Sequence, residues 1–275
     1  MSSLKELKNR ISSVATTRKI TQARQMISSA QLHRCQGELA NARLYLASLE
    51  ALPGIDVSFS PMGAEGRKGE TAIVVMGSDT GMCGPFNDRM IKQMEQIRQT
   101  EGDDRLFVPI GHKICNAALA GGYRTDGSCD MAGLATYDDT AAKAQWLMEG
   151  FLTGRFSRVE VLWHNYRSIG VQLPKRRVLM PVALPPSSPV ANDLSITEPS
   201  PMEMVEQTLA MMVCARLWLC TSSSRTSEQA ARMMAMQAAT ENADKILSEL
   251  KLSYNKIRQN NITTELLDIV GSSFA

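Results

Sequence analysis

Two long stretches, one at each end of the chain, have the apolar spacing of helices that pair with another helix. The apolar positions of the N-terminal seam are Leu4, Leu7, Ile11 and Val14 and, after a slip, Ile20, Ala23, Ile27 and Ala30. Those of the C-terminal seam are Met236, Ala239, Ala243, Ile246, Leu250 and Ile257, with the polar Ser253 among them. A mean period of 3.5 residues predicts the narrow seam of a coiled coil rather than the wider face of a bundle helix. The alternative is that both stretches are ordinary surface helices. Their length argues against this alternative.

The distribution of glycine and proline supports two long helices. Residues 1–52 contain a single glycine, Gly37, and no proline, and residues 202–270 contain neither. Because these two residues are the strongest helix breakers, both ends can be continuous helices. At about 1.5 Å per residue, the C-terminal helix would reach roughly 100 Å. Since the rest of the chain lies between the two helices in sequence, we expect them to pair antiparallel.

The middle of the chain alternates short apolar, β-branched runs with helical stretches. The expected strands are 71–76, 105–110, 158–164 and 171–180, and the expected helices are 87–100, 112–120 and 137–151. This alternation predicts an α/β domain with a largely parallel sheet. The predicted segments are a coiled-coil helix (1–52), a glycine-rich connector (53–70), the α/β domain (71–180), a proline-rich linker (181–201) and a second coiled-coil helix (202–275).

Composition excludes several classes of protein. The 275 residues are 44% apolar and 21% charged, as in soluble globular proteins, and the net charge of +2 shows no excess typical of nucleic-acid binders. The first ten residues are charged and polar, so we expect no signal peptide. The most apolar window, 209–220, contains Arg216 and is shorter than the roughly 20 residues that span a bilayer. We therefore expect a soluble protein of a reducing compartment.

The loop GSDTGMCGPFN after the first strand is the candidate for ligand chemistry. A glycine-bearing loop between a strand and a helix can bind phosphate through its backbone amides. Its glycines, at 77, 81 and 84, fit neither nucleotide fingerprint, and no lysine follows them. We interpret Gly81, Cys83 and Gly84 as a structural turn, with Cys83 buried. The cysteines form no CxxC pair and the histidines are scattered, so we expect no metal, no cofactor and no catalytic residue.

The N-terminal helix is basic. No acidic residue lies between Glu6 and Glu38. The basic residues in that interval are Lys8, Arg10, Arg18, Lys19, Arg24 and Arg34. Such a helix suits an acidic protein surface or nucleic acid, with a simple solvated face as the alternative. No aromatic residue interleaves with these charges, which argues against binding of single-stranded nucleic acid.

Both ends of the chain resemble one family. The runs SEQAARMMAMQAATENADKI (227–246) and YNKIRQNNITTELLDIVGSS (254–273) are similar to the C-terminal helix of the γ subunit of F-type ATP synthase. The run SLKELKNRISSVATTRKITQA (3–23) is similar to its N-terminal helix, and EPSP (198–201) to the entry of its C-terminal helix. The turn residues Asp79, Gly81, Cys83, Gly84 and Asn87 also match. This chain departs from the family's usual pattern at Thr80, Pro85, Arg24 and the stretch 211–226.

The resemblance implies a fold, a function and partners. The fold is an antiparallel coiled coil of the two ends with a Rossmann-like α/β domain between them. The function is that of the central-stalk rotor, a non-catalytic subunit. Its rotation couples proton translocation through the c-ring to ATP synthesis or hydrolysis in the α3β3 hexamer. The partners are the α, β and ε subunits and the c-ring, without nucleic acid. The location is peripheral, on the cytoplasmic face of a bacterial inner membrane or the equivalent face of an organelle membrane.

The resemblance also implies contact residues. Arg258 and Gln259 correspond to the family's contact with the β subunits, and Arg24 stands where the family has methionine along the same shaft. Ser195 and Glu198 correspond to the rotor foot that meets the c-ring. Two other classes stay open from the residues alone: a Rossmann-type nucleotide-binding enzyme with helical extensions, and a basic coiled-coil protein that binds nucleic acid. Nucleotide affinity of the isolated chain would favour the enzyme, and salt-sensitive DNA binding would favour the protein that binds nucleic acid.

Overall fold

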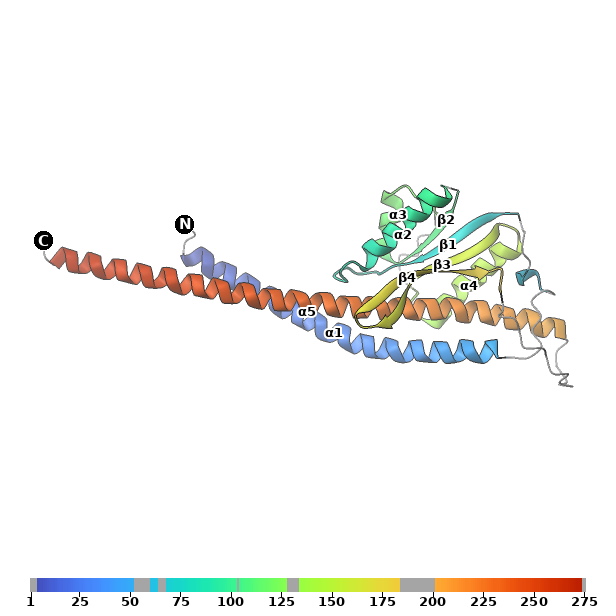
Figure 1. The fold of residues 1–275 in the computed structure, drawn as a ribbon, viewed down its shortest axis with the longest axis horizontal. Helices are drawn as coiled ribbons and strands as arrows, with labels where there is room; N and C mark the ends of the chain where they lie inside the picture. Colours follow the sequence, from blue (N-terminus) through green and yellow to red (C-terminus); the bar gives the residue numbers. More distant parts are fainter. Residues whose placement is uncertain are drawn as a thin grey trace. The chain divides into compact units, whose positions relative to one another are not determined.

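The computed structural model describes residues 4–51, 60–63, 68–102, 104–127, 134–183 and 201–273. Its elements are α1 (Leu4–Glu50), η2 (Pro61–Gly63), β1 (Glu70–Met76), α2 (Phe86–Glu101), β2 (Leu106–Ile110), α3 (His112–Ala120), α4 (Tyr137–Leu152), β3 (Phe156–Ser168), β4 (Val171–Met180) and α5 (Pro201–Ser273). The predicted fold class, an α/β domain between two long terminal helices, is confirmed (Figure 1). The five-segment division of the chain stays a prediction.

The described strands form one mixed sheet in the order β2-β1-β3-β4. β1 lies parallel to β2 and to β3, as the alternation of strands and helices predicts. β4 runs antiparallel to β3. The reason is the connection of two residues, Ile169 and Gly170, which is long enough for a hairpin but too short for a parallel crossover.

Helices cover both faces of this sheet. Ala72, Val74 and Met76 of β1 pack in the apolar core that α4 and α5 share. Ile73 and Val75 pack in a second core against α2 and α3. A strand that is covered on both faces is apolar at every position, which is why β1 reads as a continuous apolar run rather than an alternating one. Figure 1 shows α2 and α3 on one side of the sheet and α4 on the other.

The chain forms two compact units, and each contains a part of both long helices. One unit consists of Met1–Ser29 and Arg232–Ala275, and the other of Ala30–Ala231. In the first unit, Arg18 contacts Asp244 and Thr21 contacts Thr240. In the second, Cys35 contacts Thr226 and Glu38 contacts Arg225. In both cases the numbers fall along α5 as they rise along α1, so the two helices are antiparallel, as predicted.

The slip predicted in the N-terminal seam is wrong. The first rhythm continues without interruption through buried or half-buried positions of α1, at Leu4, Leu7, Ile11, Val14, Arg18, Thr21, Gln25 and Ser28. Ile20 and Ile27 are instead 56% and 54% exposed. Polar residues occupy the seam because α5 offers polar partners there. The hydroxyls of Thr21 and Thr240 are 2.8 Å apart, and Arg18 forms an ion pair with Asp244.

The predicted C-terminal seam is largely correct. Met236, Ala239, Ala243, Leu250 and Ile257 are buried or half-buried, as expected. At the other two predicted positions, Ile246 and Ser253, the covered residue is the next one along, Leu247 and Tyr254, and Thr240 beside Ala239 is half-buried as well. Ile246, which we expected in the seam, is 43% exposed, whereas Leu247 is 9% exposed. Spacings of 3 and 4 both fit a heptad, so the neighbouring helix decides which of two adjacent residues faces it.

This corrected register predicts different costs for two adjacent substitutions. Leu247→Ala should lower the free energy of unfolding of the coiled-coil unit, residues 1–29 and 232–275, by about 2 kcal/mol. The reason is that it removes buried aliphatic carbon. Ile246→Ala should change it by less than about 0.5 kcal/mol, because Ile246 faces solvent. Amide hydrogen exchange across residues 236–257 of the full chain measures both. Equal loss of protection in the two variants would contradict the register.

Candidate functional site

The loop between β1 and α2 is closed by its own side chains. Asn87, in the first turn of α2, accepts a hydrogen bond from the Ser78 amide (3.1 Å). Its amide nitrogen donates to the Ser78 hydroxyl (2.8 Å) and to the Cys83 sulfur (3.4 Å). Cys83 is buried, and Gly84 has a φ of 56°, in the left-handed region that glycine adopts without strain. The three predicted turn residues, Gly81, Cys83 and Gly84, therefore lie in a loop that is held internally.

The same loop is poorly suited to a phosphate. A phosphate-binding loop directs backbone amides at the anion, but here the Ser78 amide is bonded to Asn87. The carboxylate of Asp79 accepts from the His112 amide (3.3 Å) and adds negative charge at the end of β1. The adjoining cavity of about 190 Å³, bordered by Gly77, Asp79 and Arg225, is smaller than the roughly 300–1,000 Å³ of typical ligand pockets.

The residues expected to contact β lie in the coiled-coil unit. Arg24 is on the exposed side of α1, away from the seam. Arg258 and Gln259 are exposed on α5, immediately after Ile257 ends the seam. With Arg18 opposite Asp244, Arg24 lies level with a residue near 238. The structure therefore places Arg24 roughly 30 Å along the coil from Arg258, at about 1.5 Å per residue, and does not bring the two together.

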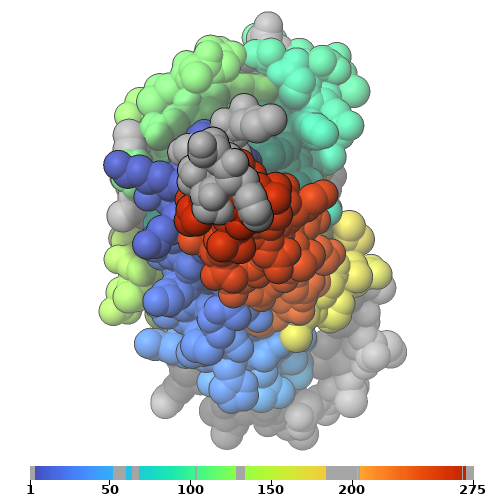
Figure 2. Space-filling model, turned by 90° about the vertical axis from the view of Figure 1, so that its left-hand side faces the viewer, coloured from blue at the N-terminus to red at the C-terminus, as the bar shows by residue number. Residues whose placement is uncertain are grey.

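The end of α5 continues past the first described residue of α1. α1 begins at Leu4, opposite Ile257, so residues 258–273 extend beyond the paired part of the coil. Figure 1 shows the red end of α5 reaching beyond the start of α1, and Figure 2, which views the molecule from this end, shows the red segment in front. The large apolar side chains exposed on this extension are Ile262, Leu266, Leu267, Ile269 and Val270. They form an exposed apolar surface next to Arg258 and Gln259.

The two residues expected at the rotor foot, Ser195 and Glu198, lie outside the described residues, as does nearly all of the linker 181–201. Of the six basic residues between Glu6 and Glu38, two have carboxylate partners among the described residues. Arg18 pairs with Asp244, and Arg34 pairs with Glu38 at 3.1 Å. In the described part of the chain, no helix is long and apolar enough to cross a membrane.

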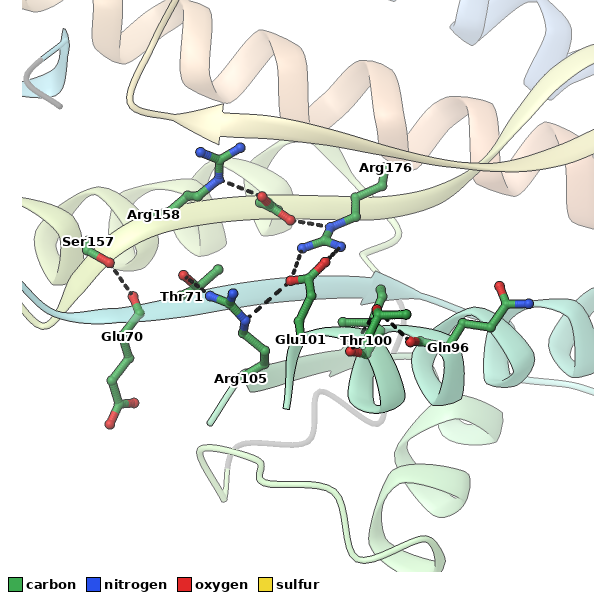
Figure 3. A network of polar contacts seen from close by, with 11 residues as sticks. Glu70, Thr71, Gln96, Thr100, Glu101, Arg105, Ser157, Arg158 and Arg176 are labelled. Atoms are coloured by element: carbon green, nitrogen blue, oxygen red, sulfur yellow. Dashed lines mark hydrogen bonds and ion pairs between the residues drawn. The ribbon is translucent and has the colours of Figure 1, made fainter. Parts of the chain in front are cut away.

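The structure contains a network of arginines and carboxylates that the sequence analysis did not predict. Glu160 of β3 has a side chain that is 6% exposed and accepts from Arg158 (2.6 Å) and from Arg176 of β4. Arg176 also donates through both terminal nitrogens to Glu101 at the end of α2. Figure 3 shows Arg176 facing Glu101, with Arg105 on the other side of that carboxylate. The network ties α2, β3 and β4 together.

The network shifts the titration of its members. The hydrogen bond from Arg176 lowers the pKa of the Glu101 carboxyl, and the same bond raises the pKa of Arg176. One signal in the sequence is relevant: Arg158 and Glu160 are two apart on a strand, so they lie on one face. Their partners from α2 and β4 carry no comparable signal, because the pairing depends on how these elements pack.

Comparison with known proteins identifies relatives over the whole chain. A family model described as ATP synthase matches residues 3–275. The ATP synthase gamma chain of Bacteroides fragilis is 38% identical, and the match covers 100% of both chains. That of Bacteroides thetaiotaomicron is 35% identical, and the match covers 99% of both.

Solved structures agree on the fold. One is a chain of the Euglena gracilis mitochondrial ATP synthase, OSCP/F1/c-ring, in rotational state 3. It matches with a TM-score of 0.68 and 16% identity over 99% of this chain and 94% of that chain. Another, from the rotor of the same enzyme in rotational state 1, matches with a TM-score of 0.64 and 16% identity over 94% and 98%. At this identity the matches show a common fold.

These matches confirm the family expected from the terminal motifs. They do not favour the two other classes, a Rossmann-type enzyme and a coiled-coil protein that binds nucleic acid. The family match includes both long helices and the α/β domain between them. This chain belongs to the ATP synthase gamma chain family.

Proposed function

We propose that this chain is the central-stalk rotor subunit of an F-type ATP synthase. Its rotation couples proton translocation through the c-ring to ATP synthesis or hydrolysis in the α3β3 hexamer. The observation that carries this function is the family match over residues 3–275, which includes the whole shaft. The solved structures of the same fold, which come from an OSCP/F1/c-ring assembly and from a rotor, support it.

The proposed partners follow from the parts of the chain. The coiled coil and the extension of α5 lie within the ring of α and β subunits. Arg258, Gln259 and Arg24 contact β, and their exposure supports this role. Arginine at position 24 adds a permanent charge and five donors to the shaft. The α/β domain carries ε, and Ser195 and Glu198 meet the c-ring. The chain is thus peripheral to the membrane, on the cytoplasmic face of a bacterial inner membrane or the equivalent organelle face.

The chain itself is proposed to be non-catalytic. The Asn87-bonded turn, the carboxylate of Asp79 at the end of β1 and the small cavity beside it support this, because each disfavours a bound nucleotide. The turn of Gly81, Cys83 and Gly84 then has a structural role: it fixes the start of α2 against the ends of β1 and β2.

Assembly and coupling test the proposed function together. The tagged chain should co-purify with an α/β hexamer and a c-ring. In the reconstituted complex, Arg258→Ala with Gln259→Ala should lower coupled ATP synthesis roughly tenfold. The reason is that charge-assisted hydrogen bonds of about 1.5–3 kcal/mol are lost at the contact with β. The isolated chain should not hydrolyse ATP.

The adjacent exposed pair Asn260→Ala with Asn261→Ala is the matched control and should leave synthesis unchanged. Saturable ATP hydrolysis by the purified chain, free of α and β, would overturn the rotor assignment. Unchanged synthesis in the Arg258–Gln259 variant would refute the contact with β but not the assembly.

A further inference from the structure

The run TSSSRTS, residues 221–227 of α5, is an unusual helical segment. Six of its side chains carry hydroxyls, and all six are buried. A helix that is buried on all sides is normally apolar, because a buried hydroxyl without a partner is costly. This segment begins within the stretch 211–226 in which the sequence departs from its family. Its polar character therefore calls for partners in this chain.

Two of the serines complete the edge of β3. β1 pairs with β3 as far as Val75 and Leu162, so the last residues of β3 have no strand on that edge among the described residues. Ser223 fills this place, since its hydroxyl donates to the His164 carbonyl (3.1 Å) and accepts from the Tyr166 amide (2.9 Å). Ser227 donates to the same His164 carbonyl (3.2 Å). The two hydroxyls replace the backbone groups of a neighbouring strand.

α1 holds the same end of β3 from its own side. The side-chain amide of Gln36 donates to the Tyr166 phenol oxygen (2.7 Å), and the Arg43 guanidinium donates to the Tyr166 carbonyl (3.4 Å). The two helices are also joined to each other at this level. Thr226 donates to the Cys35 carbonyl (3.2 Å). The end of β3 is thus bonded to both helices.

We infer that these residues form a clasp that transmits torque between the α/β domain and the shaft. The clasp consists of Ser223 and Ser227 of α5 and Gln36 and Arg43 of α1, all bonded to the end of β3 at His164 and Tyr166. This inference rests on the proposed rotor function. α1 and α5 continue from the clasp into the coiled coil, and β3 is part of the sheet that carries the α/β domain.

Hydrogen bonds suit this role better than apolar contacts. Burial of apolar surface opposes separation of the sheet from the helices, but it is non-directional and resists sliding weakly. A hydrogen bond weakens steeply when its angle changes, so bonds on both sides of Tyr166 resist rotation of the sheet about the helix pair. Ser223, Ser227, Gln36 and Arg43 are accordingly positioning residues for rotary coupling.

The chain offers a matched control for the test. Ser222 and Ser224 lie in the same helical turns and are equally buried, but their hydroxyls have no hydrogen-bond partner among the described residues. Ser223→Ala with Ser227→Ala removes the same atoms as Ser222→Ala with Ser224→Ala, and only the first pair opens the clasp. Tyr166→Phe, which deletes the bond to Gln36 alone, tests the α1 side with a milder change.

Two measurements on the full chain decide the inference. The first is amide hydrogen exchange at Tyr166, which should become about tenfold faster in the Ser223–Ser227 variant and stay unchanged in the control. The second is the angular variance of a probe on the α/β domain during rotary dwells of the complex with α and β. A softer link gives a larger variance, which we expect for the Ser223–Ser227 variant and, to a smaller extent, for Tyr166→Phe.

Faster exchange with a larger variance than the control supports the clasp. Faster exchange with an unchanged variance would show that the bonds are structural and carry no torque. Equal behaviour of the variant and the control in both measurements would overturn the clasp altogether. If the unmodified chain fails to assemble with α and β, the proposed function fails instead, and this outcome is separate because it precedes any comparison of variants.

Discussion

Lowering the pH from about 7.5 to about 4.5 is expected to destabilise the unit of residues 30–231 by about 2–3 kcal/mol through His164 alone. The imidazole is fully buried, stacks on Phe86 with ring centroids 4.0 Å apart, and has no hydrogen-bond partner for either nitrogen among the described residues. Burial, and secondarily the charge of Arg89, lowers the pKa of His164 to about 3. The folded protein therefore keeps this ring neutral.

The direction and the window follow from the two pKa values. In the unfolded chain His164 takes up a proton near pH 6.5, whereas in the folded chain it stays neutral down to about 3. Between these values the unfolded state binds more protons, so stability falls as the pH falls, by about 1.4 kcal/mol per pH unit. Carboxylates with lowered pKa values, such as Glu101, add to the loss mainly below about pH 4.5, where the unfolded carboxyls bind protons. Most of the loss between about pH 6.5 and 5.5 therefore comes from the histidine.

His164→Leu should remove this pH dependence and raise the stability at neutral pH by about 1–2 kcal/mol, because two unsatisfied nitrogens leave the core. Urea unfolding followed by tryptophan fluorescence reports on this unit, since Trp146, Trp163 and Trp218 all lie within it. The exposed His33 provides the control, His33→Leu. A His164→Leu variant that keeps the wild-type slope between pH 6.5 and 4.5 would be incompatible with a buried neutral imidazole.

Replacing Arg176 by alanine is expected to lower the free energy of unfolding by about 3 kcal/mol. Arg176 is bonded to Glu160 and to Glu101, and the side chain of Glu160 is almost completely buried. Without Arg176, Glu160 keeps only Arg158 as a described ion-pair partner, so part of a buried negative charge is left uncompensated. The same tryptophan-detected unfolding measures the loss. Acid sensitivity below about pH 4.5 should also decrease, because Arg176 no longer lowers the pKa of Glu101.

Two further variants separate this charge effect from a loss of packing. Glu160→Gln in the Arg176→Ala background should recover part of the stability, since it removes the charge left without its partner. Arg167→Ala, at an exposed position of the same hairpin, should cost less than about 0.5 kcal/mol. If Glu160→Gln makes the Arg176→Ala protein still less stable, the contribution of Arg176 is packing by its aliphatic stem rather than charge.

The sequence by itself determined the elements and their order. The absence of glycine and proline from 202–270 predicted α5, because no residue there interrupts a helix. The β-branched run TAIVVM predicted β1. The hairpin of β3 and β4 was not predicted, because the expected third strand ended at 164, whereas β3 continues to Ser168. The terminal motifs indicated the family, which the comparisons confirm. All of these signals are local or are read from the order of residues along one chain.

The tertiary structure alone decided which side chains meet. A heptad allows steps of three or four, so the sequence could not choose between Ile246 and Leu247, and the antiparallel partner α1 did. From the sequence, a polar seam residue such as Thr21 is expected at the surface. Only the structure shows that Thr240 of α5 lies opposite it. The bonds of Ser223 to the end of β3, and of Arg176 to Glu101, join residues more than fifty positions apart. Such contacts have no periodicity in the chain, because they arise from the packing of separate elements against one another.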